Sequence, residues 1–199
     1  ILAAIMRPVT ETQTFLISTN AGPSPIAGRG CSPFFFATSY NNDQNQAVMG
    51  AAANEGVDVG GQNRVIRRAI IITPNYQAGR DAAAGFKSTF RGEVMDEIYV
   101  PLTITDFSAE LARIAAARPE GIYTFMPGGL GVQFVRQYRQ AGLTIPVLSA
   151  FTVDEATLPA QGESALGLFT GTTWTPTLPN AQNMRFVNDF IGQFNYVPA

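Results

Sequence analysis

The sequence predicts an α/β fold in which helices cover both faces of a parallel β-sheet. Short runs of branched and aromatic residues alternate with amphipathic stretches of helical spacing, and this alternation recurs along the whole chain. The chain is 199 residues long and 46% hydrophobic, which is enough to bury a full core and argues against disorder. The repeated pattern and the apolar content together predict the α/β class.

The expected strands are short and rich in branched and aromatic residues, and turn-forming residues follow most of them. In chain order they are residues 14–17, 34–36, 68–73, 93–100, 122–126, 146–149 and 168–172. A long loop rich in Gly, Pro and Ser, residues 18–33, separates the first two strands. Loops of this length are usually functional.

Each expected helix begins at a capping residue or a turn, and the first four end at Gly or Pro. The starts are Asn42 or Asp43, the turn at 74–76, Asp106, the turn at 127–129 and Asn180, and the ends are Gly56, Gly92, Pro119 and Gly142. Apolar residues at helical spacing predict buried helix faces. These faces comprise Ala83, Phe86 and Phe90; Phe107, Leu111, Ile114 and Ala115; Leu130, Phe134 and Tyr138; and Phe186, Val187, Phe190, Ile191 and Phe194.

The two ends of the sequence lack the usual boundary signals. The chain begins in an apolar run without an initiator Met or a capping residue, and residues 196–198 resemble the exit from a helix. We therefore expect the natural protein to continue on both sides, with any export signal upstream.

Composition argues against several classes of function. The net charge is −2 and the basic residues form no stripe, so nucleic acid is not an expected partner. The longest apolar stretches fall short of the roughly 20 residues that a membrane-spanning helix needs, so the chain is not expected to span a membrane. The absence of histidine and the single cysteine, Cys31, remove the commonest general base and metal ligand. We expect no catalytic residue, no metal and no cofactor.

Two motifs leave alternatives open. Asp154 and Glu155 form an acid–base pair or open a short helix, and the second use is the commoner one. The GGLG run at residues 128–131 is a phosphate loop or a plain tight turn. The turn is favoured, because the run lacks the Lys-Ser/Thr of a P-loop and the full dinucleotide glycine spacing.

Ligands of open parallel sheets bind at the carboxyl ends of the strands. The loops expected to meet there are residues 18–22, 39–43, 74–79, 127–131 and 150–154. Several lead into helix N-termini, whose free N–H groups favour an anion without any basic side chain. Tyr40, Tyr76 and Phe151 lie at strand ends and outside the helical faces, so they contact a ligand or fill the core. The pattern suits a small carboxylate ligand.

Five segments carry a resemblance to a known family. They are FLISTNAG (15–22), TSYNNDQ (38–44), PNYQAG (74–79), DFSAEL (106–111) and QYRQAGL (137–143). In this order and spacing they resemble the type I periplasmic solute-binding proteins of branched-chain amino acid type ABC transporters, over essentially the whole chain. The resemblance implies a periplasmic receptor that catalyses no reaction and delivers its ligand to membrane permease subunits.

The resemblance also implies an organisation in lobes. Members of that family have two doubly wound lobes that close on a ligand by a hinge motion. By this resemblance, residues 1–40 belong to the first lobe, residues 41–171 form the second, and residues 172–199 return to the first. The expected fold is therefore the two-lobed type I periplasmic-binding-protein fold, with the first lobe incomplete in this chain.

The same resemblance implies roles for individual residues. The family holds the ligand carboxylate at a first-lobe loop, which here contains Ser18, Asn20, Ala21 and Gly22. The loops at residues 39–43, 74–79 and 127–131 add Tyr40, Tyr76, Gln77, Ala78 and Gly128 to the expected ligand site. Amino-acid binders of the family commonly hold the ligand ammonium with an acidic residue where this chain has Phe151. That departure points to the subgroup that takes up aromatic acids, although Asp154 would serve an ammonium if the register differs by a few residues.

Two other classes of function remain as alternatives. One is a ligand-sensing domain of the same fold in a signalling receptor or regulator, which a DNA-binding or transmembrane segment in the flanking sequence would reveal. The other is a small-molecule enzyme, which would show turnover of a bound acid that is lost on changing Asp154 or Glu155.

Overall fold

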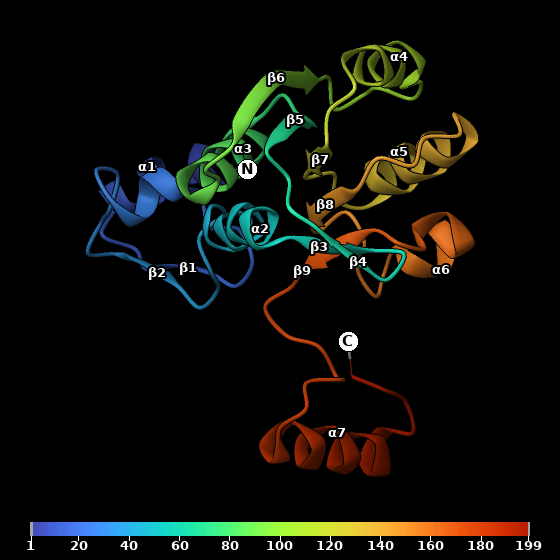
Figure 1. Ribbon diagram of the computed structural model, residues 1–199. Coiled ribbons are helices and arrows are strands. Elements are labelled where there is room, and N and C mark those ends of the chain that lie inside the picture. The colour runs from blue at the N-terminus through green and yellow to red at the C-terminus, as the bar shows by residue number, and fades with distance from the viewer. Residues whose placement is uncertain (1, 199) are drawn as a thin grey trace.

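The computed structural model describes residues 2–198, and its largest part is a five-stranded parallel sheet with helices on both faces (Figure 1). Its strands are β5 (Arg68–Pro74), β6 (Glu93–Val100), β7 (Gly121–Thr124), β8 (Val147–Ala150) and β9 (Phe169–Gly171). They lie in the order β6-β5-β7-β8-β9, and every neighbouring pair is parallel. The predicted α/β class and these five strands are confirmed, with small shifts of their ends.

Strand β5 shows why the sheet is covered on both sides. Its consecutive isoleucines alternate between the two faces, as side chains of any strand do, and all of them are buried. Ile71 packs in a core cluster with Met49 of α2 and Phe86 of α3, whereas Ile70 and Ile72 pack in a second cluster with residues of α4 and α5. The helices are α2 (Gln44–Glu55), α3 (Gln77–Thr89), α4 (Ser108–Ala117) and α5 (Gly129–Gln140).

One expectation about this region is wrong, and one element was not predicted. Ala115 is exposed, because the buried stripe of α4 is narrower than the apolar spacing suggested and consists of Leu111 and Ile114. An antiparallel hairpin of β3 (Val57–Val59) and β4 (Gln62–Arg64) was not predicted. Its turn is Gly60-Gly61 with positive φ at both residues, and a Gly-Gly pair between two short runs is a known hairpin signal.

Two short elements follow β8, helix α6 (Leu158–Gln161) and a 3₁₀ helix (Gly162–Ala165). Another 3₁₀ helix (Ser24–Ala27) lies in the first long loop. Within residues 2–198, no helix combines the length and the apolar character that crossing a bilayer requires.

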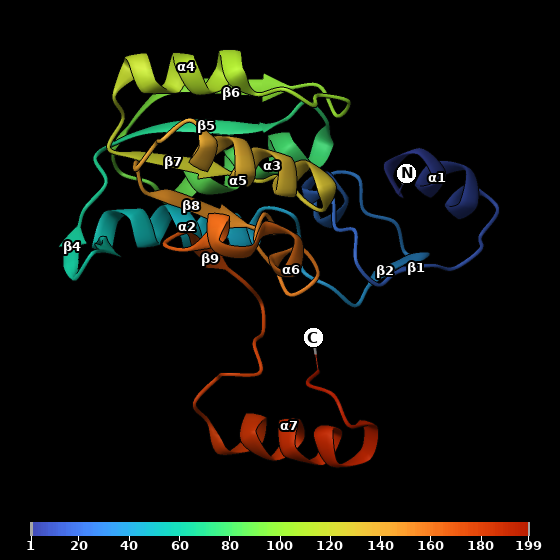
Figure 2. The same ribbon diagram turned by 90° about the vertical axis from the view of Figure 1, so that its right-hand side faces the viewer.

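The first residues form a separate small unit beside the main sheet (Figures 1 and 2). Strands β1 (Leu16–Ser18) and β2 (Phe35–Ala37) pair in parallel, and helix α1 (Leu2–Glu11) lies against them. Leu2 and Met6 of the helix pack with Ile26, while Ile1 lies outside the described residues. The two predicted strands are confirmed with a shift of one or two residues. The lobe boundaries at residues 40 and 171 stay a prediction.

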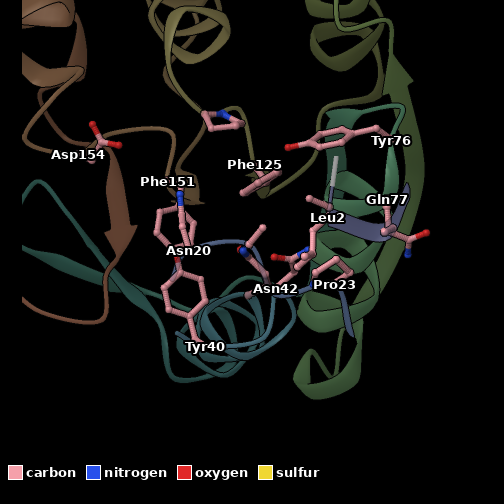
Figure 3. A pocket seen from close by; sticks show the side chains of 15 residues that line it. Leu2, Asn20, Pro23, Tyr40, Asn42, Tyr76, Gln77, Phe125, Phe151 and Asp154 are labelled. Carbon is pink, nitrogen blue, oxygen red and sulfur yellow. The ribbon is translucent and has the colours of Figure 1, made fainter. Parts of the chain in front are cut away.

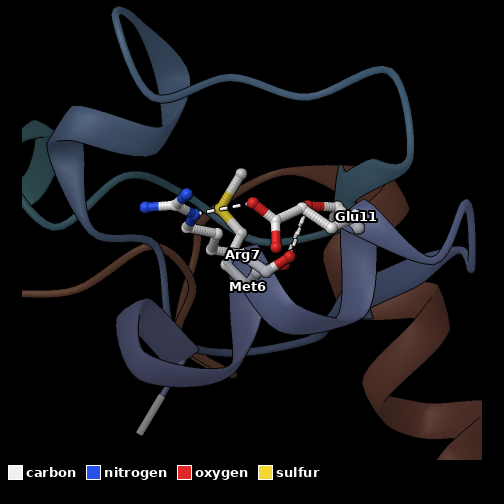
Figure 4. Close-up of polar contacts among 4 residues, drawn as sticks. Met6, Arg7 and Glu11 are labelled. Atoms are coloured by element: carbon white, nitrogen blue, oxygen red, sulfur yellow. Dashed lines mark hydrogen bonds and ion pairs between the residues drawn. The ribbon is translucent and has the colours of Figure 1, made fainter.

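Helix α1 is held by contacts along its own surface (Figure 4). Arg7 Nε lies 2.7 Å from Glu11 Oε1, and the Thr10 hydroxyl donates to the Met6 carbonyl over 2.8 Å. Such an exposed i,i+4 ion pair contributes little. The helix therefore depends mainly on its buried face, which Leu2 and Met6 supply.

Helix α7 (Ala181–Phe194) stands apart from the sheet in both views (Figures 1 and 2). The predicted cap is confirmed, since Asn180 Oδ1 accepts a hydrogen bond from Asn183 N over 2.8 Å. The predicted burial of its aromatic face is wrong: Phe186 and Phe194 are each 49% exposed. Helical spacing shows that a face is apolar but does not supply the element that covers it. Among the described residues, Trp174 and Tyr196 cover this face only in part.

A single tryptophan, Trp174, joins the segment after β9 to α7. Its ring packs edge-on against Phe186 at 5.9 Å, and its Nε1 donates to Asn183 Oδ1 over 2.7 Å. The Asn183 amide in turn donates to carbonyl groups of the preceding segment, including Pro176 O at 3.0 Å. This network fixes residues 174–178, which follow β9, to the start of α7.

The exposed apolar side chains lead to a prediction about the chain by itself. Phe15, Ile17 and Phe36 of the β1–β2 unit are each more than half exposed, as is Met184 of α7. Apolar surface of this kind drives association. We expect the 199-residue chain, expressed alone, to form soluble aggregates in light scattering and to bind a hydrophobic dye. A monodisperse monomer that unfolds cooperatively would contradict this expectation.

Candidate functional site

A cavity of about 390 Å³ lies between the small β1–β2 unit and the carboxyl ends of the main strands (Figure 3). This volume lies in the range of small-molecule sites. Its lining combines residues from both parts of the chain. They are Leu2, Ala3, Asn20, Ala21, Pro23, Tyr40, Asn42, Gln46, Tyr76, Gln77, Ala78, Phe125, Pro127, Phe151 and Asp154.

The sheet order explains why the cavity lies here. Strand β5 has β6 on one side and β7 on the other, so the helices that follow β5 and β7 cover opposite faces. A crevice forms at such a switch point, outside the carboxyl ends of the two strands. Tyr76 follows β5 and Phe125 follows β7, and both line the cavity.

Two glycines let the helices begin close to the strand ends. A Cβ on Gly79 would lie 1.9 Å from Pro74 O, and one on Gly131 would lie 2.1 Å from Met126 O. Each glycine is the third residue of its helix, five positions after the crowded carbonyl group. The close approach places the first turns of α3 and α5 beside the cavity.

Aromatic rings form the walls of the cavity (Figure 3). Tyr40 and Phe151 stack at 5.2 Å with an angle of 19°, and Tyr76 and Phe125 stack at 6.5 Å with an angle of 28°. Phe125 also meets Phe151 edge-on at 6.2 Å, which links the two pairs. Burial raises the pKa of both Tyr40 and Tyr76, so their hydroxyls stay neutral at physiological pH. Such walls suit a flat apolar ring.

Phe151 holds its place in an unfavourable backbone conformation. Its φ is +60°, in the left-handed region that non-glycine residues rarely adopt. The next residue, Thr152, is buried and anchored twice: its hydroxyl accepts from Met126 N over 2.9 Å, and its carbonyl accepts from Gln161 Nε2 over 2.6 Å. The surrounding hydrogen bonds thus maintain a strained residue in a cavity wall, as is common at binding sites.

A buried carboxylate organises the polar side of the cavity. Asp81 of α3 accepts hydrogen bonds from Ser24 N at 3.1 Å, Asn42 Nδ2 at 3.1 Å and Gln77 Nε2 at 2.8 Å. Its donors come from the long first loop, the segment before α2 and the first turn of α3. Asp81 therefore ties together the three segments that bring Pro23, Asn42 and Gln77 to the cavity.

Most of the predicted site residues meet at this cavity. Those in its lining are Asn20, Ala21, Tyr40, Tyr76, Gln77, Ala78, Phe151 and Asp154. Their role in ligand binding stays a prediction.

Three predicted residues do not line the cavity. The Ser18 hydroxyl donates to the Ala21 carbonyl over 2.6 Å, and Gly22 packs so closely on Tyr40 that a Cβ would lie 2.1 Å from its carbonyl oxygen. Both residues shape the loop that carries Asn20 and Ala21. Gly128 precedes α5 with a φ of +63° and serves the turn.

The electrostatics of the lining are unusual for an anion site. None of the lining residues carries a basic side chain, and its one carboxylate, Asp154, accepts at Oδ1 from the backbone and hydroxyl of Thr157, each over 2.8 Å. The first turn of α3 lines the cavity at Gln77 and Ala78, and no side chain caps its N–H groups. An anion here would be held by backbone N–H groups and neutral amides.

Sequence reasoning missed several lining residues, among them the buried Gln46 and Phe125. Phe125 was placed inside a buried strand, but β7 ends at Thr124 and the ring lies in the cavity wall. Gln46 stands in the first turn of α2, where an apolar spacing pattern gives a glutamine no signal. Only the folded structure shows that this side chain is buried, with 1% of its surface exposed.

Comparison with known proteins gives a consistent result. A family model described as periplasmic binding protein matches residues 1–197. The Leu/Ile/Val-binding protein homolog 6 of Brucella melitensis is 29% identical over 182 residues, which are 87% of this chain and 44% of that protein. The chain thus spans about half the length of the relatives it matches.

Solved structures resemble the whole chain. A solute-binding protein of an ABC transporter from R. palustris, in complex with benzoate, has a TM-score of 0.83 and 29% identity over 98% of this chain and 53% of that one. A second, from Rhodopseudomonas palustris BisB5 in complex with 3,4-dihydroxybenzoic acid, has a TM-score of 0.77 and 32% identity over 96% of this chain and 52% of that one. A leucine-, isoleucine-, valine-, threonine- and alanine-binding protein from Brucella ovis, with 21% identity and a TM-score of 0.82 over 98% of this chain and 51% of that one, shares the fold.

Proposed function

The chain belongs to the periplasmic binding protein family, in its type I group of branched-chain amino acid ABC transport proteins, and from this premise we propose that its cavity binds an aromatic carboxylate. The family consists of solute-binding proteins and not of enzymes. The resemblance and the type I fold expected from the sequence are both confirmed.

The observation that carries the proposal is the pair of stacked aromatic walls, Tyr40 with Phe151 and Tyr76 with Phe125. Because Phe125 and Phe151 meet edge-on, a planar ring that enters the cavity can stack face-on against one pair while its edge contacts the other. A branched aliphatic side chain would fit such flat walls less well. An amino acid would also need a partner for its ammonium, and the lining offers one carboxylate, Asp154, whose Oδ1 already accepts two hydrogen bonds from Thr157. The relatives from R. palustris solved with benzoate and 3,4-dihydroxybenzoic acid support the same class of ligand.

The ligand carboxylate is assigned to the exposed side of the cavity. The loop of Asn20 and Ala21, shaped by Ser18 and Gly22, lies there, and the uncapped first turn of α3 also reaches the cavity. Backbone N–H groups at a helix N-terminus stabilise a negative charge without a basic side chain. As in the family, the protein would act in the periplasm and deliver its ligand to permease subunits.

A thermal-shift screen of the protein in its full natural length tests the proposal. Benzoate, 4-hydroxybenzoate and phenylpropanoid acids are compared with leucine, isoleucine and valine. A ligand that binds only the folded state, at about 100 times its Kd, stabilises that state by about 2.7 kcal/mol, so the aromatic acids are expected to raise Tm by a few degrees. A rise with the three amino acids alone would overturn the aromatic assignment. No rise with any of them would also reject it and favour another solute or a sensor.

A further inference from the structure

A single hydrogen bond joins the small β1–β2 unit directly to the helices of the main sheet. Ser24 N, in the long loop between β1 and β2, donates to Asp81 Oδ2 of α3 over 3.1 Å. Within the part of the chain that the structure describes, no other hydrogen bond or ion pair connects residues 2–37 with residues 44–171. This one contact therefore has a direct influence on how the two parts are held together.

The acceptor of this bond is buried among neutral donors. Asp81 is 6% exposed, and its other two hydrogen bonds come from the side-chain amides of Asn42 and Gln77. None of the ion pairs among the described residues includes Asp81. A buried carboxylate that loses a donor is destabilised, because no water replaces the lost hydrogen bond. The Ser24 N–H is thus one of three groups that compensate the burial of Asp81.

Ser24 contributes its backbone and not its side chain. It begins the 3₁₀ helix Ser24–Ala27 and lies between Pro23 and Pro25, which have no N–H group of their own. Its N–H is therefore the donor that this stretch of the loop offers to α3. The Ser24 hydroxyl is buried and has no hydrogen-bond partner among the described residues.

The position of the bond couples it to the ligand cavity. Pro23, Asn42 and Gln77, which are neighbours or partners of the two bonded residues, all line the cavity (Figure 3). Periplasmic binding proteins close around a ligand by a hinge motion. A motion that carried the small unit away from α3 would break the bond and let water hydrate Asp81. The bond therefore stabilises the closed arrangement relative to the open one.

We propose that the hydrogen bond from Ser24 N to Asp81 is a closure latch, which slows the release of the ligand without contacting it. Asp81 is in this sense a positioning residue, because it holds the first loop over the cavity and does not itself line the cavity. The proposal rests on the proposed function, since the ligand occupies the same cavity. It adds a residue pair that sets the lifetime of the complex.

The test separates the rate of release from the rate of binding, using 4-fluorobenzoate and the protein in its full natural length. Exchange between the free and bound ¹⁹F NMR signals gives koff, calorimetry gives Kd, and their ratio gives kon. Ser24→Pro removes the N–H donor, and proline suits the first position of a helical turn. In this variant koff is expected to rise about tenfold, the effect of one hydrogen bond to a charged group, while kon changes less than about twofold.

Two further variants make the test decisive. Ser24→Ala is the matched control, because it keeps the N–H and removes only a hydroxyl that has no partner; koff and kon are both expected to stay within about twofold of the wild type. Asp81→Asn keeps the shape of the acceptor but replaces one of its two oxygens by a donor, so koff is expected to rise at least about threefold. This variant decides the question if Ser24→Pro does not fold.

The outcomes separate the latch from the proposed function. If Ser24→Pro releases 4-fluorobenzoate no faster than Ser24→Ala, or if it lowers kon and leaves koff unchanged, the latch is refuted while the aromatic-acid site stands. If the wild type does not bind 4-fluorobenzoate, the proposed function fails, and hydrogen exchange of the Ser24 amide decides the latch. Protection of this amide in the wild type, lost about tenfold in Asp81→Asn, supports the latch, and equal exchange in both refutes it.

Discussion

Replacing Gly131 by alanine is expected to destabilise the protein by about 3 kcal/mol, a large effect for the addition of one methyl group. The added Cβ would lie 2.1 Å from Met126 O and 2.9 Å from Thr152 O. Both neighbours are backbone atoms, so relief requires α5 to move away from the end of β7. Chemical denaturation of the protein in its full natural length measures the change.

A matched control lies two residues earlier in the same helix. A Cβ on Gly129 would meet no heavy atom within 4 Å, and its φ is not positive. Gly129→Ala is therefore expected to change the free energy of unfolding by less than about 1 kcal/mol. Equal effects of the two substitutions would show that close packing at Gly131 is not what matters. Gly131→Ala should also weaken ligand binding, because α5 begins beside the cavity.

Replacing Phe151 by glycine is expected to weaken the binding of an aromatic acid about thirtyfold, or about 2 kcal/mol, with little change in stability. The substitution removes the ring that stacks on Tyr40 and meets Phe125. It also relieves the left-handed backbone at φ +60°, which costs a non-glycine residue about 1 kcal/mol. The loss of packing and the relief of strain oppose each other, so the free energy of unfolding should change by less than about 1 kcal/mol.

Phe151→Ala is the matched control for the backbone. It loses the same ring but keeps the unfavourable φ, so it should bind as weakly as the glycine variant and be less stable by about 1 kcal/mol. Calorimetry gives the affinities and thermal unfolding gives the stabilities. An alanine variant as stable as the glycine variant would show that the backbone at this position is not strained. Unchanged affinity in both would remove Phe151 from the binding site.

The core of the main sheet was predictable because its pattern is local. The isoleucines of β5 form a continuous apolar run, which indicates a strand buried on both faces, and the helices carry spaced apolar residues such as Phe134 and Tyr138. The face of α7 shows the limit of this method. Phe186 and Phe194 have the spacing of core residues, but burial depends on a covering element, and the described residues cover this face only in part.

The cavity was predictable only in part. Parallel strands bring their following loops to one edge, and this rule located Tyr40, Tyr76 and Phe151. Neither this rule nor the family resemblance, which assigned Ser18 and Gly22 to the ligand, distinguishes residues that line a cavity from residues that shape it. Gln46 was missed because its burial depends on Tyr123, which lies 77 positions later in the chain and gives no local pattern.

The position of Trp174 gives the protein a built-in optical reporter. It is the only tryptophan of the 199 residues, so fluorescence excited at the red edge of the absorption band arises at the segment between β9 and α7 and nowhere else in this sequence. Its indole is held by Asn183 and Phe186 of α7, outside the ligand cavity. Emission from this ring therefore senses rearrangement of the segment between β9 and α7 and not direct quenching by a bound acid. A rearrangement of this segment is therefore observable in these 199 residues without an added label.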